Sequence, residues 1–199
     1  MIIGITGGIA TGKSTVSHYL KQLGYQVIDA DQISFEALTK DTKCIQNVLT
    51  KFECQDQNGN IDRKKLGEII FNDKIKQQQL EDIVHPYVIK NIKKQIKNSM
   101  QTIVFLDIPL LYEAKLEYLC DYVVVVYINE QLQKQRLKER NHLTNQEVEA
   151  RIQSQMPIET KKQLAHYIIN NEGDLNNLYD QIEVFLKKIN KGEIEWNNC

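Results

Sequence analysis

Residues 7–14 read Gly7-Gly8-Ile9-Ala10-Thr11-Gly12-Lys13-Ser14. They match the pattern G-x-x-x-x-G-K-[ST], with an apolar run at residues 2–6 before them and an amphipathic pattern at residues 13–23 after them. A strand, a glycine-rich turn and a helix in this order surround phosphate oxygens with backbone N–H groups and with the positive end of the helix. The stretch therefore predicts a nucleotide phosphate site, and we call residues 7–14 the phosphate loop.

Three side chains at the end of the phosphate loop have separate expected roles. Lys13 is expected to reach the β- and γ-phosphates, and the Ser14 hydroxyl to bind the Mg²⁺ that accompanies ATP. Thr15 adds a contact to the α-phosphate. The rest of the expected ATP-binding cradle is Gly8, Ile9, Ala10, Thr11 and Gly12.

Composition excludes several other classes of protein. The chain has 199 residues, of which 42% are apolar, with 25 basic and 26 acidic side chains. This balance suits one globular domain and gives no basic field for nucleic acid. The four cysteines form no C-x-x-C or zinc pattern, no signal peptide is present, and no apolar run reaches about 18 residues. We therefore expect a reduced, cytoplasmic protein without a membrane span, as a monomer or weak homo-oligomer.

Short apolar runs alternate with helical periodicity along the chain, which predicts an α/β fold with a parallel sheet of five strands flanked by helices. The expected strands are residues 2–6, 26–29, 103–107, 122–128 and 165–169. Residues 31–100 are expected to be mostly helical, with a turn at 56–60 and a break or kink near His85, because Pro86 interrupts a helical pattern. Helices are also expected at 130–140, 145–155 and 174–188, with a frayed tail from residue 191.

The phosphate loop does not specify a reaction. A GTPase needs a D-x-x-G switch and an N/T-K-x-D base reader, whereas Asp107 is followed by Ile-Pro-Leu and no N/T-K-x-D occurs. The chain is also short for the large ATPase classes. A small-molecule kinase remains, and a non-catalytic nucleotide-binding module is the alternative.

Two carboxylates, Asp29 and Asp31, follow the expected strand at residues 26–29. The carboxyl ends of strands line the ligand crevice of an open α/β sheet, so one of them can accept the proton of an attacking hydroxyl. A helix N-cap or an indirect contact to Mg²⁺ is the structural alternative for either. Asp107 ends a strand expected beside the first one, where a carboxylate can hold Mg²⁺ through water. A turn-initiating Asp before Pro109 explains it equally well.

At this point a family resemblance becomes specific. The D-A-D string at 29–31, His85-Pro86 and the string D-I-P-L-L-Y-E at 107–113 resemble those of the dephospho-CoA kinase family. Further similar blocks occur in the same order at residues 5–9, 122–127, 135–140, 151–155 and 168–173. The phosphate loop is shared by many families, but these blocks together are much more specific.

The resemblance implies that ATP phosphorylates the ribose 3′-hydroxyl of dephospho-CoA, giving coenzyme A and ADP. It implies Asp31 as the catalytic carboxylate, with Lys13 and Arg140 as the catalytic cations. It implies one kinase domain with a nucleotide-binding core (1–30, 101–137 and 157–199), a helical CoA-binding lobe (31–100) and a lid (138–156). The substrate-binding residues that it implies are Thr6, Asp31, His85, Leu110, Leu111 and Glu113.

Some of these assignments keep a simpler alternative. An exposed salt bridge is the usual role of arginines such as Arg140, Arg136 and Arg151 on a charged helix. His85 is equally well explained as a neutral residue at a helix break. Two departures from the family pattern stand out: Ala10-Thr11 replaces Gly-Ser in the loop, and His166 replaces Asp before the last strand. Ala10 and Thr11 are both small enough for the phosphate cradle. His166 puts the local packing or polar contacts before the last strand in doubt, but not the chemistry.

Overall fold

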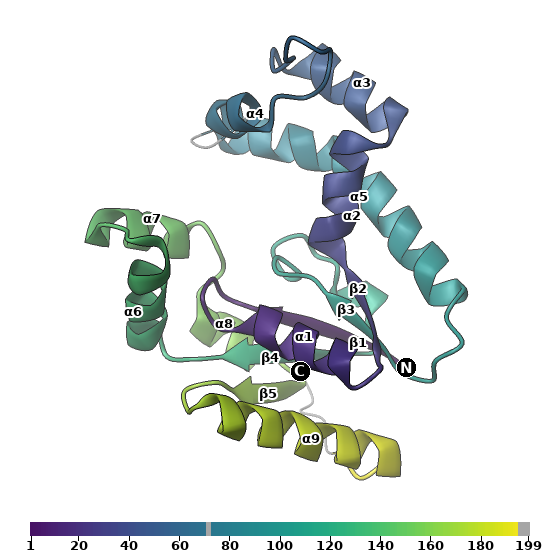
Figure 1. Cartoon of the computed structure of the whole chain (residues 1–199), viewed down its shortest axis with the longest axis vertical. Coiled ribbons are helices and arrows are strands. Elements are labelled where there is room, and N and C mark those ends of the chain that lie inside the picture. Colours follow the sequence, from purple (N-terminus) through teal and green to yellow (C-terminus); the bar gives the residue numbers. More distant parts are fainter. Residues whose placement is uncertain (71–72, 195–199) are drawn as a thin grey trace. The chain divides into compact units, whose positions relative to one another are not determined.

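The computed structural model describes residues 1–70 and 73–194. The chain forms two compact units, one made of residues 1–28 and the chain from residue 100 onward, the other of residues 29–99. The first unit carries the phosphate loop (Figure 1). The second consists mainly of helices.

Within the described residues the sheet has five parallel strands in the order β2-β3-β1-β4-β5. This confirms the expected fold class. Parallel pairing joins β1 to β3 and to β4, and β4 to β5, so that β1 is the central strand. Because Ile5 is in register with Asp107 in parallel strands, the phosphate loop and Asp107 both lie at the carboxyl ends of the strands. The strands are β1 (Ile2–Gly7), β2 (Gln26–Asp29), β3 (Val104–Asp107), β4 (Tyr122–Tyr127) and β5 (Tyr167–Asn170).

Strand β4 shows why this unit has helices on both faces. Val124 and Val126 pack into a core shared with α1 and α9, whereas Val125 and Tyr127 pack on the other side against Ile158 of α8. A strand that buries both faces has a continuous apolar run, as β4 does. The helical elements of this unit are α1 (Lys13–Gln22), the 3₁₀ turn η1 (Glu117–Leu119), α6 (Glu130–Asn141), α7 (Asn145–Gln153), α8 (Ile158–Gln163) and α9 (Leu175–Lys191).

Helix α8 and the end of helix α9 differ from the sequence-based expectations for this unit. Helix α8 was not expected, because a six-residue segment is too short to show a clear apolar period. Helix α9 runs past the expected end at residue 188 to Lys191, and it stops at Gly192, whose φ of 68° suits the left-handed C-cap that glycine adopts readily. Of the expected frayed tail, residues 195–199 lie outside the described part of the chain.

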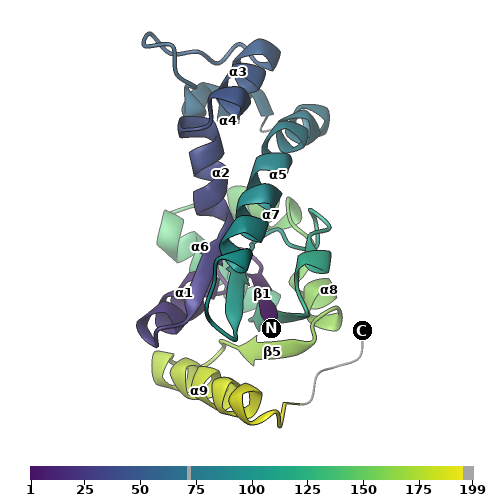
Figure 2. The same cartoon turned by 90° about the vertical axis from the view of Figure 1, so that its right-hand side faces the viewer.

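The second unit has its own core. Helix α5 packs against α2, α3 and α4, and Figure 2 shows α2 and α5 side by side. Val48, Phe52 and Leu66 are buried there. The expected turn is present, since Asp56 N–H donates to the Asn60 carbonyl at 2.8 Å. The helices are α2 (Ala30–Thr39), α3 (Thr42–Lys51), α4 (Arg63–Ile70) and α5 (Lys74–Lys97).

Of the break or kink expected near His85, the break does not occur, because α5 is a single helix that contains Pro86. Proline removes one backbone hydrogen bond from a helix interior and usually destabilises it. Val84, Val88 and Ile92 are buried on either side of the proline, so packing on both sides holds the helix together. Tertiary contacts here outweigh a local preference.

A search of the described residues for a membrane-spanning helix finds none with the necessary length and apolar character.

Candidate active site

The phosphate loop ends at the open N-terminus of α1. Gly12 is the N-cap, and its carbonyl accepts the N–H groups of Thr15 at 3.0 Å and Val16 at 3.3 Å. No side chain caps the helix and no acidic residue lies in its first turn. The first N–H groups of a helix carry a partial positive charge. The arrangement therefore offers the anion site that the sequence predicts.

Gly12 is required by both its backbone and its surroundings. Its φ is 89°, and a Cβ placed on it would lie 2.1 Å from Nδ2 of Asn171. That amide donates to the Thr11 carbonyl at 2.8 Å, and Asn171 is 8% exposed. The glycine thus makes room for a side chain that comes from the end of β5. This bond joins groups 160 residues apart, and no local sequence signal indicates it.

The two loop departures have different consequences. Ala10 has a φ of 62°, a left-handed conformation that costs a side chain some energy and that glycine adopts without cost. Thr11 is buried, and its hydroxyl donates to the Gly8 carbonyl at 2.9 Å. The loop therefore keeps its shape with a small strain at Ala10 and an added internal bond from Thr11.

Lys13 and Asp107 form an ion pair. Their side chains are only 15% and 8% exposed, respectively. The structure thus places Asp107 at the neighbouring strand end and brings it against the loop lysine. Its carboxylate and the exposed Ser14 hydroxyl are oxygen donors of the kind that Mg²⁺ prefers.

The two carboxylates after β2 have different surroundings. Asp29 is the N-cap of α2, and its Oδ1 accepts the Gln32 N–H at 3.0 Å. Asp31 lies in the first turn of the same helix and is exposed. The N-cap alternative is therefore correct for Asp29, while Asp31 presents its carboxylate at the surface of the second unit.

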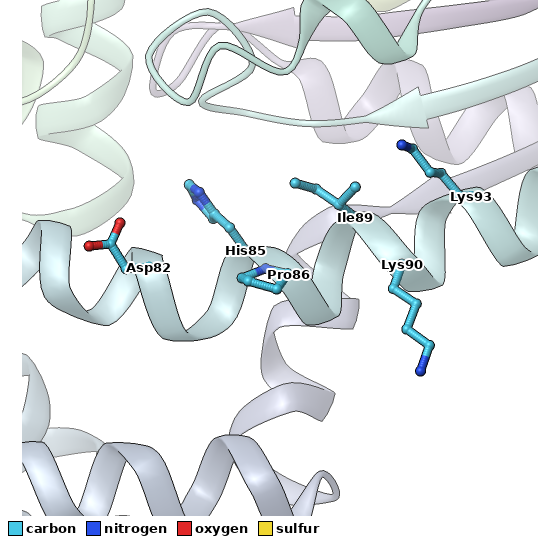
Figure 3. A pocket seen from close by; sticks show the side chains of 6 residues that line it. All are labelled: Asp82, His85, Pro86, Ile89, Lys90 and Lys93. Carbon is cyan, nitrogen blue, oxygen red and sulfur yellow. The ribbon is translucent and has the colours of Figure 1, made fainter.

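His85 lies in a pocket of about 690 Å³ on α5. Figure 3 shows His85, Ile89 and Lys93 projecting to the same side of the helix. Lys90 also lines the pocket, as do Asp82 and Pro86. Two lysines and a histidine around an apolar surface suit an anionic ligand with an apolar part.

A buried polar network holds residues 109–113. The Pro109 carbonyl accepts the Thr6 hydroxyl at 2.9 Å and Nζ of Lys161 at 3.0 Å. Nζ of Lys161 also pairs with Glu113 Oε1 at 2.9 Å, and this oxygen accepts the Met156 N–H at 2.9 Å. Thr6 and Glu113, both expected to contact the acceptor, are thus joined through one lysine and one carbonyl.

Lys161 was missed by sequence reasoning. It is completely buried, and this burial lowers its pKa while the Glu113 carboxylate opposes the shift. Within a charged segment, Lys161-Lys162 is typical of a solvated helix face, so no local signal distinguishes Lys161.

Of the two expected substrate-binding leucines, Leu111 is fully buried, and Leu110 is 40% exposed.

Arg140 lies in the last turn of α6, where it is exposed and its Nε donates to Asn141 Oδ1 at 2.9 Å. Arg136 is half-buried on the same helix, and Arg151 is exposed on α7. Helices α6 and α7 contact each other through an ion pair between Lys134 and Glu149 at 2.6 Å. Figure 1 shows the two helices in green.

His166 has a local role. Its Nδ1 accepts the Val123 N–H at 3.1 Å, its own N–H donates to the Val123 carbonyl at 3.0 Å, and its ring meets Tyr122 edge-on. The replacement of the family's usual Asp therefore leaves the start of β4 with a polar partner.

The fold and the loop define the class of protein. A central strand, a glycine loop and an open helix N-terminus, with a lysine paired to a carboxylate on the next strand, make up the site of a P-loop nucleotide-dependent enzyme. The profile of the family described as dephospho-CoA kinase matches residues 1–177.

Individual proteins agree with this match. A dephospho-CoA kinase from Carboxydothermus hydrogenoformans is 44% identical over 192 residues, covering 94% of this chain and 93% of that protein. The structure of a dephospho-CoA kinase from Campylobacter jejuni has a TM-score of 0.74 at 31% identity, covering 97% and 98% of the two chains. A shikimate kinase from Bacteroides thetaiotaomicron, at 13% identity, a TM-score of 0.53 and coverage of 96% and 98%, shares the fold.

The chain belongs to the dephospho-CoA kinase family. It is therefore an enzyme, a kinase that uses a nucleoside triphosphate as phosphoryl donor.

Proposed function

We propose that this kinase transfers the γ-phosphoryl group of ATP to the ribose 3′-hydroxyl of dephospho-CoA, giving coenzyme A and ADP. The observation that carries the proposal is the phosphate loop at the open N-terminus of α1, with Lys13 paired to Asp107, in a chain of this family. Phosphoryl transfer needs little covalent chemistry from the protein, so positioning and charge neutralisation supply most of the rate.

The donor side is assigned to the loop. Lys13 binds the β- and γ-phosphates, and the N–H groups of the loop and of the first turn of α1 bind the phosphate oxygens around it. Ser14 and Asp107 are the residues that would hold Mg²⁺, since both offer hard oxygen donors beside the lysine. When bound with ATP, the ion neutralises phosphate charge as it develops during transfer.

Two acceptor-side roles are assigned to the second unit. Asp31 accepts the proton of the attacking hydroxyl, because it is exposed in the first turn of α2 while Asp29 serves as the cap. Residues 31–100 are proposed as the CoA-binding lobe. The pocket of His85, Lys90 and Lys93 supports this, since its charge suits the diphosphate and its apolar part suits the pantetheine arm.

Residues 109–113 form the other proposed acceptor contact. Leu110 is exposed for this purpose, and the network of Thr6, Lys161 and Glu113 keeps the segment in place. Leu111 is fully buried and packs against Gly4, so it supports the segment from the interior.

Residues 138–156 are proposed as a lid, with Arg140 as the cation that meets the γ-phosphate as charge shifts. We expect Arg140→Ala to lower kcat at least about tenfold with a smaller change in the KM for dephospho-CoA, because the contact is made in the transition state. Steady-state kinetics with both substrates measure this. Arg151→Ala on the neighbouring helix is the matched control. Equal losses in the two variants, or a kcat of Arg140→Ala within twofold of wild type, would contradict the assignment.

The proposed reaction is tested by ADP release with ATP and Mg²⁺ against a panel of acceptors. Dephospho-CoA is expected to support turnover, whereas adenosine, AMP, CMP and shikimate are not. Turnover with another member of the panel would preserve the donor side and overturn the acceptor assignment. Nucleotide binding without turnover on any acceptor would favour a binding module instead.

A further inference from the structure

Two glutamine side chains hold the backbone of Ile9, a residue of the phosphate loop, through the peptide groups on either side of its Cα. The Ile9 N–H donates to Oε1 of Gln155 at 2.8 Å, and Nε2 of Gln133 donates to the Ile9 carbonyl at 2.8 Å. Gln133 is 2% exposed. The bonds span 146 and 124 residues of sequence, respectively, so only the fold brings these groups together.

The loop is shaped to admit these amides. A Cβ on Gly8 would lie 2.4 Å from Nε2 of Gln133, so only glycine leaves the space that the amide occupies. The residue after Ile9 is Ala10, which has the left-handed φ of 62°. A residue other than glycine stays in the left-handed conformation only when its surroundings hold it there. The two glutamines supply that restraint immediately before the strained residue.

Gln133 and Gln155 lie near the two ends of the helical hairpin formed by α6 and α7. Gln133 lies in the first half of α6, and Gln155 follows the C-cap of α7. Between them α6 and α7 are braced by the Lys134–Glu149 pair and by Nζ of Lys138, which donates to Asn145 Oδ1 at 2.8 Å. Gln133 near the start of α6 and Gln155 after the end of α7 are therefore both bonded to the backbone of Ile9.

We infer that Gln133 and Gln155 are positioning residues for phosphoryl transfer, which act through Ile9 and keep the phosphate loop in the conformation that binds ATP. The inference rests on the proposed role of this loop as the ATP site. The two side chains use opposite chemistry, since Gln155 accepts and Gln133 donates. Loss of either side chain leaves one backbone polar group of Ile9, the N–H or the carbonyl, without this partner.

The test compares Gln155→Met, Gln133→Met and the double variant with Gln153→Met, whose glutamine is exposed at the end of α7 and serves as the matched control. Each single variant is expected to weaken binding of a non-hydrolysable ATP analogue by about tenfold in calorimetry, the typical consequence of one unsatisfied, partly buried polar group. Gln153→Met is expected to bind like wild type. Because both bonds hold the backbone of the same residue, the double variant is expected to lose less than the product of the two single losses.

A second measurement separates positioning from general destabilisation. Hydrogen exchange of the Ile9 amide, followed by NMR, is expected to accelerate in Gln155→Met while the amides of β4 stay protected. Since no acceptor is present in either experiment, failure of the dephospho-CoA assignment would leave both results standing. Affinities within twofold of Gln153→Met, fully multiplicative losses in the double variant, or unchanged Ile9 exchange in Gln155→Met would overturn the inference.

Discussion

Replacing Lys13 with alanine is expected to abolish turnover, with a loss of about a thousandfold or more. Removal of a single preorganised donor from a transition state costs about 10²–10³ in kcat, and Lys13 supplies a full charge in addition. No neighbouring group in the loop replaces that charge, because residues 7–12 have no basic side chain. Initial rates of ADP release with dephospho-CoA measure the effect.

The same change is expected to lower stability, and this has to be separated from catalysis. Asp107 would lose its ion-pair partner at a side-chain exposure of 8%. Leaving one charge of a buried pair alone costs about 3 kcal/mol, at the lower end of the usual range because Lys13 is itself 15% exposed. In the variant Lys13→Ala/Asp107→Asn the thermal midpoint is expected to recover, since the uncompensated charge is removed, while turnover stays absent. Turnover of Lys13→Ala above a tenth of the wild-type rate would contradict the assignment.

The second large effect is expected for Asp31→Asn. The amide cannot take the proton of the attacking hydroxyl, so kcat is expected to fall by at least about a hundredfold, within the usual range for loss of a general base. Asp31 is exposed and is not the residue that caps α2, so folding and ATP affinity are expected to stay close to wild type. Single-turnover kinetics and calorimetry with ATP measure the two quantities.

Asp29→Asn is the matched control for Asp31→Asn. Asparagine caps helices about as well as aspartate, so this variant is expected to keep the bond to the Gln32 N–H and most of the activity. If Asp29→Asn lost as much kcat as Asp31→Asn, the separation of cap and base would be wrong. Near-normal kcat in Asp31→Asn would remove Asp31 as the base.

The elements of the fold could be predicted because their signals are local. Strand β1 and helix α1 begin and end within one residue of the expected bounds. Four consecutive valines make β4 recognisable as a buried strand. Strand β5, expected from residue 165, begins at Tyr167, because the buried Ala165 extends the apolar pattern without joining the strand. Helix α5 continues through Pro86 without the break that the proline suggested, since contacts from α2, α3 and α4 support it on both sides.

By itself the sequence determined the phosphate loop, the α/β class and the family resemblance, because glycine spacing and apolar periodicity act over a few neighbouring residues. The tertiary structure alone decided that Lys161 joins Pro109 to Glu113, and that Asn171, Gln133 and Gln155 hold the loop. The sequence around amide and amine side chains does not indicate which groups those side chains will bind. Their partners lie far along the chain, and only packing of the sheet and its helices brings those groups within hydrogen-bond distance.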